Sequence, residues 1–405
     1  MTTSVDELDL PQLDLFTLDR EEALQRVVEA QEVHWLAKSP VGYLVTRYDD
    51  VVGILRDQRF HSGLGVLTQV AGVGDDYLAT RRPSILTMEG EEHARLRRLV
   101  APAFTPGSVE RLRPFMADVL SGLVDVVAPR GHCELVAEVC DPYPIPIICE
   151  LLGTPKEDWK LFSAWATDIF RIFNGDLATD LPAIRRASEE LEAYMRTMVD
   201  ERRRQPADDL LSALIAIEEE GDRLDTDELV LLAEAVLMAG TDTTRNQLAC
   251  CVALFADHPD QWALLAKEPD LAPRAVEESM RYLGTVRASA RIASEDIEYR
   301  GVCFPKGTLV AVTLAGANRD RRVWDDPGNF DVTVERSTLQ LTFGSGIHHC
   351  LGAALARAEL QTALPLLATR LPNLSLDGPV QWKPPNFGIW GPARLPLRFD
   401  PTPAS

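Results

Sequence analysis

Basic charge is scarce in this chain, and lysine is the scarcest of its charged residue types. The 405 residues include 62 Asp and Glu against 41 Lys and Arg, which gives a net charge of −21. Only 6 of the basic residues are lysines, and the other 35 are arginines. An excess of acid repels nucleic acid and anionic lipid surfaces, so we expect neither of them as a general partner.

The marks of export, membrane insertion and disulfide frameworks are also missing. The first residues, MTTSVDELDLPQLD, are acidic and lack the basic start and apolar run of a signal peptide. No uninterrupted apolar run is long enough to span a bilayer. The seven cysteines are odd in number and show no CxxC pair, which favours reduced thiols over disulfides. We therefore expect a cytoplasmic protein with no membrane partner.

The chain shows neither an internal repeat nor a Gly/Ser-rich or Pro-rich linker. Its 46% hydrophobic residues are enough for a large core. Most segments have helical periodicity, while alternating residues and turn signals predict strands near 41–60, 285–315 and 373–399. Because strands this far apart in sequence must pair with one another, we expect one domain over residues 1–405. Its fold class is mainly α with a smaller, interleaved β portion.

One loop, FGSGIHHCLG, presents a single cysteine, Cys350, at or near a helix start. Gly344 and Gly346 allow the loop to bend sharply. A thiolate at a helix N-terminus suits a nucleophile, a redox thiol or a metal ligand. Zinc held by His348, His349 and Cys350 is disfavoured, because adjacent residues do not easily converge on one tetrahedral ion. A buried structural cysteine and a Cys–His nucleophile both stay open at this point.

A second feature lies in a long helix that we expect over residues 227–257. Its first half is apolar on nearly every face, so the helix should be buried. The stretch AGTDTT then brings a carboxylate and hydroxyls into it. Two interpretations follow: a kink whose polar groups are satisfied, or a groove made roomy by Ala239 and Gly240, with Asp242 and Thr243 transferring protons.

A third feature is AVEESMRY, in which Glu278 and Arg281 are three residues apart and share a helix face. An isolated pair of this kind is usually a surface ion pair that contributes little to stability. Alone, it therefore carries almost no information about function.

Together, the three features resemble the cytochrome P450 family, specifically its soluble bacterial members. The cysteine loop matches the family's F-G-x-G-x-H-x-C-x-G at every specified position, and the buried helix matches A-G-x-D/E-T-T. His93 and Arg97 match the family's H-x-x-x-R, and Glu278 and Arg281 match its E-x-x-R. The matching loop and helix positions are Phe343, Gly344, Gly346, His348, Cys350 and Gly352, and Ala239, Gly240, Asp242, Thr243 and Thr244.

The resemblance implies the cytochrome P450 fold, with haem b (iron protoporphyrin IX) held between the AGTDTT helix and the Cys350 loop. Cys350 is then the axial thiolate ligand of the iron, and O2 is a co-substrate. His348 and Arg291, together with His93 and Arg97, are implied to meet the two haem propionates, whose burial without partners would be unfavourable.

One position departs from the family pattern. The family usually has an arginine eight residues before the loop phenylalanine, where it completes a network with the E-x-x-R pair. That position here is Glu335, and an arginine follows it. We expect Arg336 to take this place beside Glu278 and Arg281.

By resemblance, the chain is a haem-thiolate monooxygenase that inserts one atom of O2 into a C–H bond, with Asp242 and Thr243 delivering protons. The implied pocket is mostly apolar, so the expected substrate is a hydrophobic small molecule: a terpenoid, a steroid, a fatty acid or a polyketide. We place this pocket in residues 63–86, 170–186, 286–289 and 387–390, and at single positions that include Leu237, Met238, Val286 and Ile389.

The chain carries no flavin or iron–sulfur module, so its electrons should come from a separate ferredoxin and ferredoxin reductase. We expect a monomer. A basic patch could dock the acidic ferredoxin, although the same charges could be ordinary solvated residues. The arginines concerned are Arg95, Arg97, Arg98, Arg111, Arg113 and Arg357.

Three other activities deserve comparison with this hypothesis. A haem-thiolate sensor without turnover has no need of a proton relay, and peroxygenases of this family tend to replace the acid and the threonine. Asp242 and Thr243 therefore argue against both. A Cys–His hydrolase that uses Cys350 would be colourless and would react with thiol alkylators.

Overall fold

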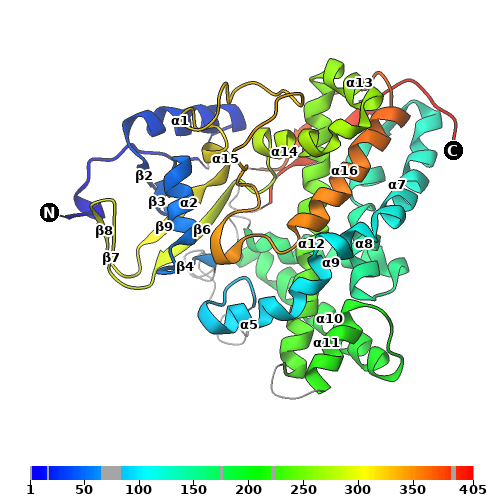
Figure 1. Ribbon diagram of the computed structural model, residues 1–405, viewed down its shortest axis with the longest axis horizontal. Coiled ribbons are helices and arrows are strands. Elements are labelled where there is room, and N and C mark those ends of the chain that lie inside the picture. Colours follow the sequence, from blue (N-terminus) through cyan, green and yellow to red (C-terminus); the bar gives the residue numbers. More distant parts are fainter. Residues whose placement is uncertain are drawn as a thin grey trace.

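The computed structural model describes residues 2–15, 18–64, 84–173, 177–219, 224–384 and 389–404. Figure 1 shows a β-rich part that contains the N-terminus beside a larger helical part that contains the C-terminus. Blue strands from the start of the chain and yellow strands from its last third lie side by side in the β-rich part. The predicted fold class, mainly α with a smaller β portion, is confirmed.

Helices dominate because long stretches of the chain repeat apolar residues at intervals of three and four. The helical part contains α5 (Gly90–Val100), α6 (Pro106–Glu110), α7 (Arg113–Val127), α8 (Pro144–Leu152), α9 (Trp159–Ile169), α10 (Leu177–Arg204), α11 (Leu210–Glu219), α12 (Thr226–Ala256), α13 (Pro259–Lys267), α14 (Ala272–Tyr282) and α16 (Ala353–Arg370). The sheet is accompanied by α1 (Arg20–Val33), α2 (Tyr48–Arg56) and α15 (Leu314–Ala317). Shorter turns include a π-turn, η4 (Val136–Cys140), and a 3₁₀ turn, η8 (Gly346–His348).

The long helix α12 runs through the helical part (Figure 1). It begins at a capping box in which Asp225 and Glu228 each accept a hydrogen bond from the other's backbone N–H. It packs against α8, α10 and α16, which bury most of its faces. Gly240 allows a close approach, because a Cβ at this position would lie 2.9 Å from the Ile148 side chain on α8. The long buried helix predicted over residues 227–257 is confirmed.

The main sheet has the strand order β2-β3-β9-β6-β4. Strands β3 and β9 are parallel, and the other neighbours are antiparallel. The bounds are β2 (Leu36–Ser39), β3 (Gly42–Val45), β9 (Leu309–Thr313), β6 (Ala288–Ala293) and β4 (Phe60–Ser62). Smaller ladders join β1 (Thr3–Ser4), β8 (Val302–Phe304) and β7 (Ile297–Tyr299); β10 (Ser375–Leu376), β13 (Pro396–Arg398) and β5 (His132–Glu134); and β11 (Gln381–Trp382) with β12 (Pro392–Arg394). Strands β1, β2 and β5 lie outside the segments in which we expected strands.

The largest hydrophobic core of the described residues lies among the helices, and the next largest lies between the main sheet and α2. The turn η8 contacts α2 in the β-rich part, and α16, which follows it, packs against α7, α13 and α14. The cysteine loop, orange in Figure 1, therefore lies where the two parts meet. Among the described residues, no helix has both the length and the hydropathy that crossing a bilayer requires.

Candidate functional site

The predicted cysteine loop is closed by its own backbone. Gly344 and Gly346 have φ angles of +70° and +73°, in the left-handed region that glycine adopts without strain. A side chain at Gly346 would also collide with the carbonyl oxygen of Leu55 on α2. The N–H of Cys350 donates to the carbonyl oxygen of Phe343 at 2.9 Å. These contacts fix the loop so that it carries Cys350 to the start of α16.

Cys350 differs from the other six cysteines in its exposure. It is exposed, whereas Cys303 is half-buried and the remaining five are buried; all seven are described, and all are free thiols. The surrounding protein desolvates the sulfur and raises the pKa of Cys350, while the N–H of Gly352 and the charges of Arg97 and Arg357 act to lower it. In the described part of the chain no histidine hydrogen-bonds this thiol, so the geometry does not favour a Cys–His nucleophile.

Two arginines of this region form no direct ion pair with a carboxylate among the described residues. Arg291, on β6, is 5% exposed and donates to Ser289 Oγ and to the carbonyl oxygen of Ala290, both at 2.8 Å. Arg97, on α5, is half-buried and donates to the carbonyl oxygen of His349 at 2.5 Å. Burial lowers the pKa of both guanidinium groups. A buried charge that lacks an opposite charge is unfavourable, so these two fit an anionic ligand.

Two histidines lie beside the cysteine loop. His93, one turn before Arg97 on α5, is 3% exposed, and its ring lies 4.6 Å from that of His348. His348 Nε2 lies 3.0 Å from Glu89 Oε1, and the N–H of Ser62 donates to the same oxygen at 2.5 Å. Burial acts to raise the pKa of Glu89, but the hydrogen bonds from His348 and Ser62 help to lower it overall. Side-chain contacts thus join α5, β4 and the cysteine loop.

These residues fit a haem better than a bare metal ion. Across the described ranges, no group of three His, Cys, Asp or Glu residues could hold a metal ion. The site instead combines one exposed thiol with buried cationic donors, of which Arg291 forms no direct ion pair with any described carboxylate. At Gly352 a Cβ would meet no protein atom within 4 Å, so protein packing does not explain this glycine. An axial thiolate, propionate carboxylates and a flat ring would account for all three observations.

On α12, Asp242 lies in a cluster of charges that the sequence analysis did not predict. Arg245, one turn later, donates to Asp242 Oδ1 through Nε at 2.5 Å. Lys383 Nζ lies 3.9 Å from the same oxygen, and Arg245 also reaches Asp141 Oδ1 at 3.4 Å. The i, i+3 spacing could have revealed Arg245. Lys383 and Asp141 come from distant segments, so nothing in the local sequence indicated them.

The threonines of AGTDTT have different partners. Thr243 Oγ donates to the carbonyl oxygen of Ala239 at 2.7 Å, a bond back to the preceding turn of the helix. Thr244 Oγ instead donates to Glu359 Oε2 on α16 at 3.0 Å. Burial raises the pKa of Glu359 to about 8, although the bond from Thr244 acts to lower it. Nothing in the local sequence indicated Glu359, which lies on an otherwise ordinary helix.

The expected pocket positions do not all lie together. An isolated antiparallel bridge pairs Val286 with Ile389, and Met238 is half-buried beside the helical core. Leu237, by contrast, is 1% exposed inside that core. Gly240 packs against Ile148 on α8, so its small size permits a close helix contact, and the groove expected beside Ala239 and Gly240 stays a prediction. Much of the pocket expectation, residues 65–83, 174–176 and 387–388, lies outside the described residues.

The network around α14 includes the arginine that departs from the family pattern. Arg281 donates twice to the Glu278 carboxylate at 2.7 Å, and Arg336 donates to it at 2.9 and 3.2 Å. Burial acts to raise the pKa of Glu278, but these hydrogen bonds outweigh it and lower the pKa. Glu335 pairs instead with Arg274 at 3.5 Å. Arg336, rather than the residue at position 335, therefore lies beside the Glu278–Arg281 pair, as we expected.

The arginines of the expected basic patch differ in whether an acidic side chain pairs with them. Arg98 and Arg111 are exposed and form no ion pair among the described residues. Three others are partly neutralised by acids: Arg95 by Glu92 and Glu228, Arg113 by Glu110, and Arg357 by Glu277. The patch is thus smaller than the sequence indicated.

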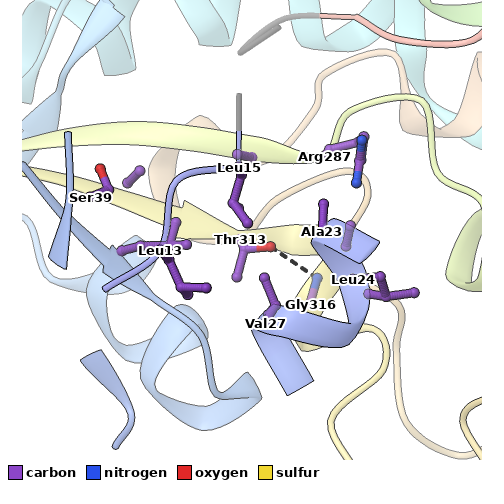
Figure 2. A pocket seen from close by; sticks show the side chains of 13 residues that line it. Leu13, Leu15, Ala23, Leu24, Val27, Ser39, Arg287, Thr313 and Gly316 are labelled. Carbon is purple, nitrogen blue, oxygen red and sulfur yellow. Dashed lines mark hydrogen bonds between the residues drawn. The ribbon is translucent and has the colours of Figure 1, made fainter. Parts of the chain in front are cut away.

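Figure 2 shows a recess between the main sheet and α1, with Leu13, Val27 and Thr313 on its walls and Arg287 at one end. No residue of α12 or of the cysteine loop lines it. The recess is therefore separate from the site around Cys350. Arg287 also lies 5.2 Å from the centre of the Trp390 ring.

A loop-held thiol beside buried cations, in a mainly α fold with a long buried helix, fits the class of haem-thiolate proteins. Comparison with known proteins gives the family. The family described as Cytochrome P450 matches residues 156–385. Luteothin monooxygenase of Streptomyces thioluteus is 37% identical over 399 residues, which cover 96% of each chain.

Two further comparisons agree with this result. Mycinamicin IV hydroxylase/epoxidase of Micromonospora griseorubida is 38% identical over 362 residues, which cover 88% of this chain and 89% of that one. The crystal structure of CalO2 is 30% identical, with a TM-score of 0.86 over 95% of this chain and 96% of that chain. The chain belongs to the cytochrome P450 family, and it is a cytochrome P450 monooxygenase. Membership implies haem with a cysteine thiolate ligand, and O2.

Proposed function

We propose that this enzyme inserts one oxygen atom from O2 into a hydrophobic small molecule, with Cys350 as the axial ligand of haem b. The observation that carries the proposal is the cysteine loop, which exposes one thiol beside Arg97 and near the buried Arg291. When bound, the haem supplies the oxidation, and the thiolate donates electron density that favours O–O cleavage. The protein supplies orientation, protons and exclusion of water.

The cationic residues bind and orient the haem in this proposal. Arg291 and Arg97 would donate to the propionates, which would relieve the penalty of burying two guanidinium groups without carboxylates. His93 and His348 add further donors. Glu89, which now pairs with His348, would keep that ring oriented or give way to a propionate. Phe343, Gly344, Gly346 and Gly352 shape the loop.

Asp242 and Thr243 supply protons in this proposal. Both lie on α12, with Asp242 almost buried, so water does not reach the carboxylate freely. Thr243 Oγ could turn from the Ala239 carbonyl oxygen to hold a water that carries a proton. Asp242 must leave Arg245 at least in part, because a carboxylate that accepts from a guanidinium is a poor proton donor. Proton transfer by such positioned groups contributes roughly 100-fold or more to rates.

For the substrate, we propose a polyketide-type natural product. Mycinamicin IV hydroxylase/epoxidase and 6-deoxyerythronolide B hydroxylase, both relatives of this chain, are named for such molecules. The apolar residues Met238, Val286 and Ile389 suit a large hydrophobic molecule. A terpenoid, a steroid or a fatty acid would be the alternative outcome of a binding screen.

Electrons are proposed to come from a ferredoxin and its reductase, with the enzyme a monomer in the cytoplasm. Arg98 and Arg111 are the exposed, unpaired charges of the described part of the patch, so an acidic ferredoxin should dock near them. The seven free cysteines fit a reducing compartment.

Labelled oxygen tests the proposed reaction. The haem-loaded enzyme is given a macrolide that perturbs its visible spectrum, a ferredoxin system and ¹⁸O₂, and the product is examined by mass spectrometry. We expect one labelled atom per oxidised product and the other in water. Product that carries oxygen from unlabelled water, or no product from any compound that perturbs the spectrum, would contradict the proposal.

A further inference from the structure

The Asp242 carboxylate is held between two cations of different chemistry. Its side chain is 4% exposed, and Arg245 donates to Oδ1 at 2.5 Å. Lys383 Nζ lies 3.9 Å from the same oxygen. A guanidinium does not deprotonate in proteins, so Arg245 can hold the carboxylate but cannot hand it a proton. An ammonium group can do both, and lysine is a known general acid and base when buried.

The main chain fixes the base of the Lys383 side chain close to α12. The N–H of Lys383 donates to the carbonyl oxygen of Gly391 at 3.0 Å, and its carbonyl oxygen accepts from Trp390 Nε1 at 2.9 Å. The rings of Trp382 and Trp390 stack 4.6 Å apart and are nearly parallel. The main chain of Lys383 and the neighbouring Trp382 are therefore held, and the long lysine side chain can change rotamer.

Lys383 is also more exposed to solvent than the carboxylate that it approaches. Its side chain is 27% exposed, against 4% for that of Asp242. The pKa of Lys383 is lowered overall, mainly because the group is buried. The nearby acidic groups, Asp242 foremost and then Asp141 and Cys250, act to raise this pKa, while the positive charge of Arg245 acts to lower it. These groups come from α12 and from the end of η4. A lysine whose pKa is below the ordinary range can lose and regain its proton more readily near neutral pH.

We infer that Lys383 is the residue through which Asp242 takes up protons from solvent. An N–H bond of the Lys383 ammonium breaks, and an O–H bond forms on Asp242 Oδ1. The neutral amine then takes a proton from water at its exposed side, so each cycle returns Lys383 to its starting state. The distance of 3.9 Å exceeds a hydrogen bond, so the transfer needs a rotamer change or one bridging water.

This inference rests on the proposed role of Asp242 and adds a positioning residue to it. Two competing explanations share the same geometry. In the first, Lys383 contributes only a positive charge that stabilises the carboxylate. In the second, protons arrive through Asp141, whose side chain is 30% exposed and which contacts Arg245 at 3.4 Å. The first explanation predicts a normal rate for Lys383→Arg. The second predicts a normal rate for Lys383→Met and a slow rate for Asp141→Asn.

The experiment compares Lys383→Met, Lys383→Arg, Asp141→Asn and Asp242→Asn in the haem-loaded enzyme. Substrate-induced spectral change and melting temperature first show that each variant is folded and binds substrate. Product formation is then measured from pH 6 to 9 in H2O and D2O. We expect Lys383→Met and Lys383→Arg to be slowed alike, by about tenfold, because arginine keeps the charge but does not release a proton. The wild-type rate should fall at high pH because Lys383 loses its proton, and neither Lys383 variant should show this fall in rate.

The outcomes separate the explanations. A normal rate in Lys383→Arg would show a role of charge alone and would overturn the inference. A normal Lys383→Met beside a slow Asp141→Asn would assign the path to Asp141, which also overturns it. A normal Asp242→Asn would remove the proposed relay itself, whatever Lys383 does.

A second readout does not depend on activity. Competitive acetylation of the haem-loaded enzyme, followed by peptide mass spectrometry, gives the pKa of each of the six lysines. Lys383 should titrate below its ordinary value, and lower still in Asp242→Asn, because the lost carboxylate had raised its pKa. An unchanged titration of Lys383 in Asp242→Asn would show that the two groups are not coupled, which contradicts the inference.

Discussion

Replacing Glu359 with glutamine should change how the stability of this protein depends on pH. Glu359 lies on α16 with 1% of its surface exposed, and no cation pairs with it in the described part of the structure. Burial raises its pKa to about 8, and the hydrogen bond that Thr244 donates at 3.0 Å is not enough to reverse this. The folded protein should therefore hold Glu359 as a neutral acid at neutral pH.

The sign and size of the effect follow from proton binding. In the unfolded chain this carboxyl has an ordinary pKa near 4.5, whereas in the fold its pKa is about 8. Between these values the folded state binds the extra proton, so Glu359 favours folding below pH 4.5 and loses that contribution as pH rises toward 8. The slope is about 1.4 kcal/mol per pH unit, or about 3 kcal/mol from pH 5 to pH 7.

Glutamine has nearly the same shape and stays neutral at every pH. Urea unfolding of haem-loaded wild type and Glu359→Gln, followed by circular dichroism, should show the variant gaining about 3 kcal/mol on wild type between pH 5 and pH 7. Glu335→Gln is the matched control, because the Glu335 side chain is 84% exposed. A difference between Glu359→Gln and wild type that stays constant with pH would mean that Glu359 is ionised inside the fold, and the reasoning would fail.

Three further predictions concern the network, the oxygen side and the partner. Arg336→Met should lower the free energy of unfolding by about 1–3 kcal/mol, since it removes two hydrogen bonds to the buried Glu278 carboxylate. If the variant is as stable as wild type in urea, Arg336 does not stabilise this network. Thr243→Ala should bind haem and substrate normally but divert electrons to peroxide, measured as product per NADH consumed, and an unchanged yield would exclude Thr243 from the proton path. Charge reversal at Arg98 or Arg111 should slow the first electron transfer from ferredoxin in stopped flow, and more so at low salt. The same reversal at Arg26, on α1, is the control, and equal effects at the three sites would refute a local docking surface.

The sequence predicted those parts of the site that lie within one short segment of chain whose residues are constrained by function. The cysteine loop is one example, because Gly344 and Gly346 adopt positive φ angles that few other residues tolerate. The helix around AGTDTT is another, because a run of apolar residues before Asp242 indicates burial directly. Such features need no knowledge of the rest of the chain.

The residues that the sequence did not predict act across the fold. Lys383 reaches Asp242 from the β11–β12 region, and Glu359 reaches Thr244 from a helix 115 residues away. Local spacing holds no signal for such pairs, which depend on how α12 packs against its neighbours. The contact of Gly240 with Ile148 on α8 is a further example, because the local sequence does not show which helix packs against this glycine.

The central claim is that Cys350 is the thiolate ligand of a bound haem. The absorption spectrum of the reduced carbon monoxide complex tests it most directly, for wild type, for Cys350→Ser, and for Cys303→Ser as the control at a half-buried cysteine. We predict the strongly red-shifted band of a thiolate-ligated haem in wild type and in Cys303→Ser, and its loss in Cys350→Ser. A Cys350→Ser variant that keeps the red-shifted band would contradict the account, because another residue would then be the ligand.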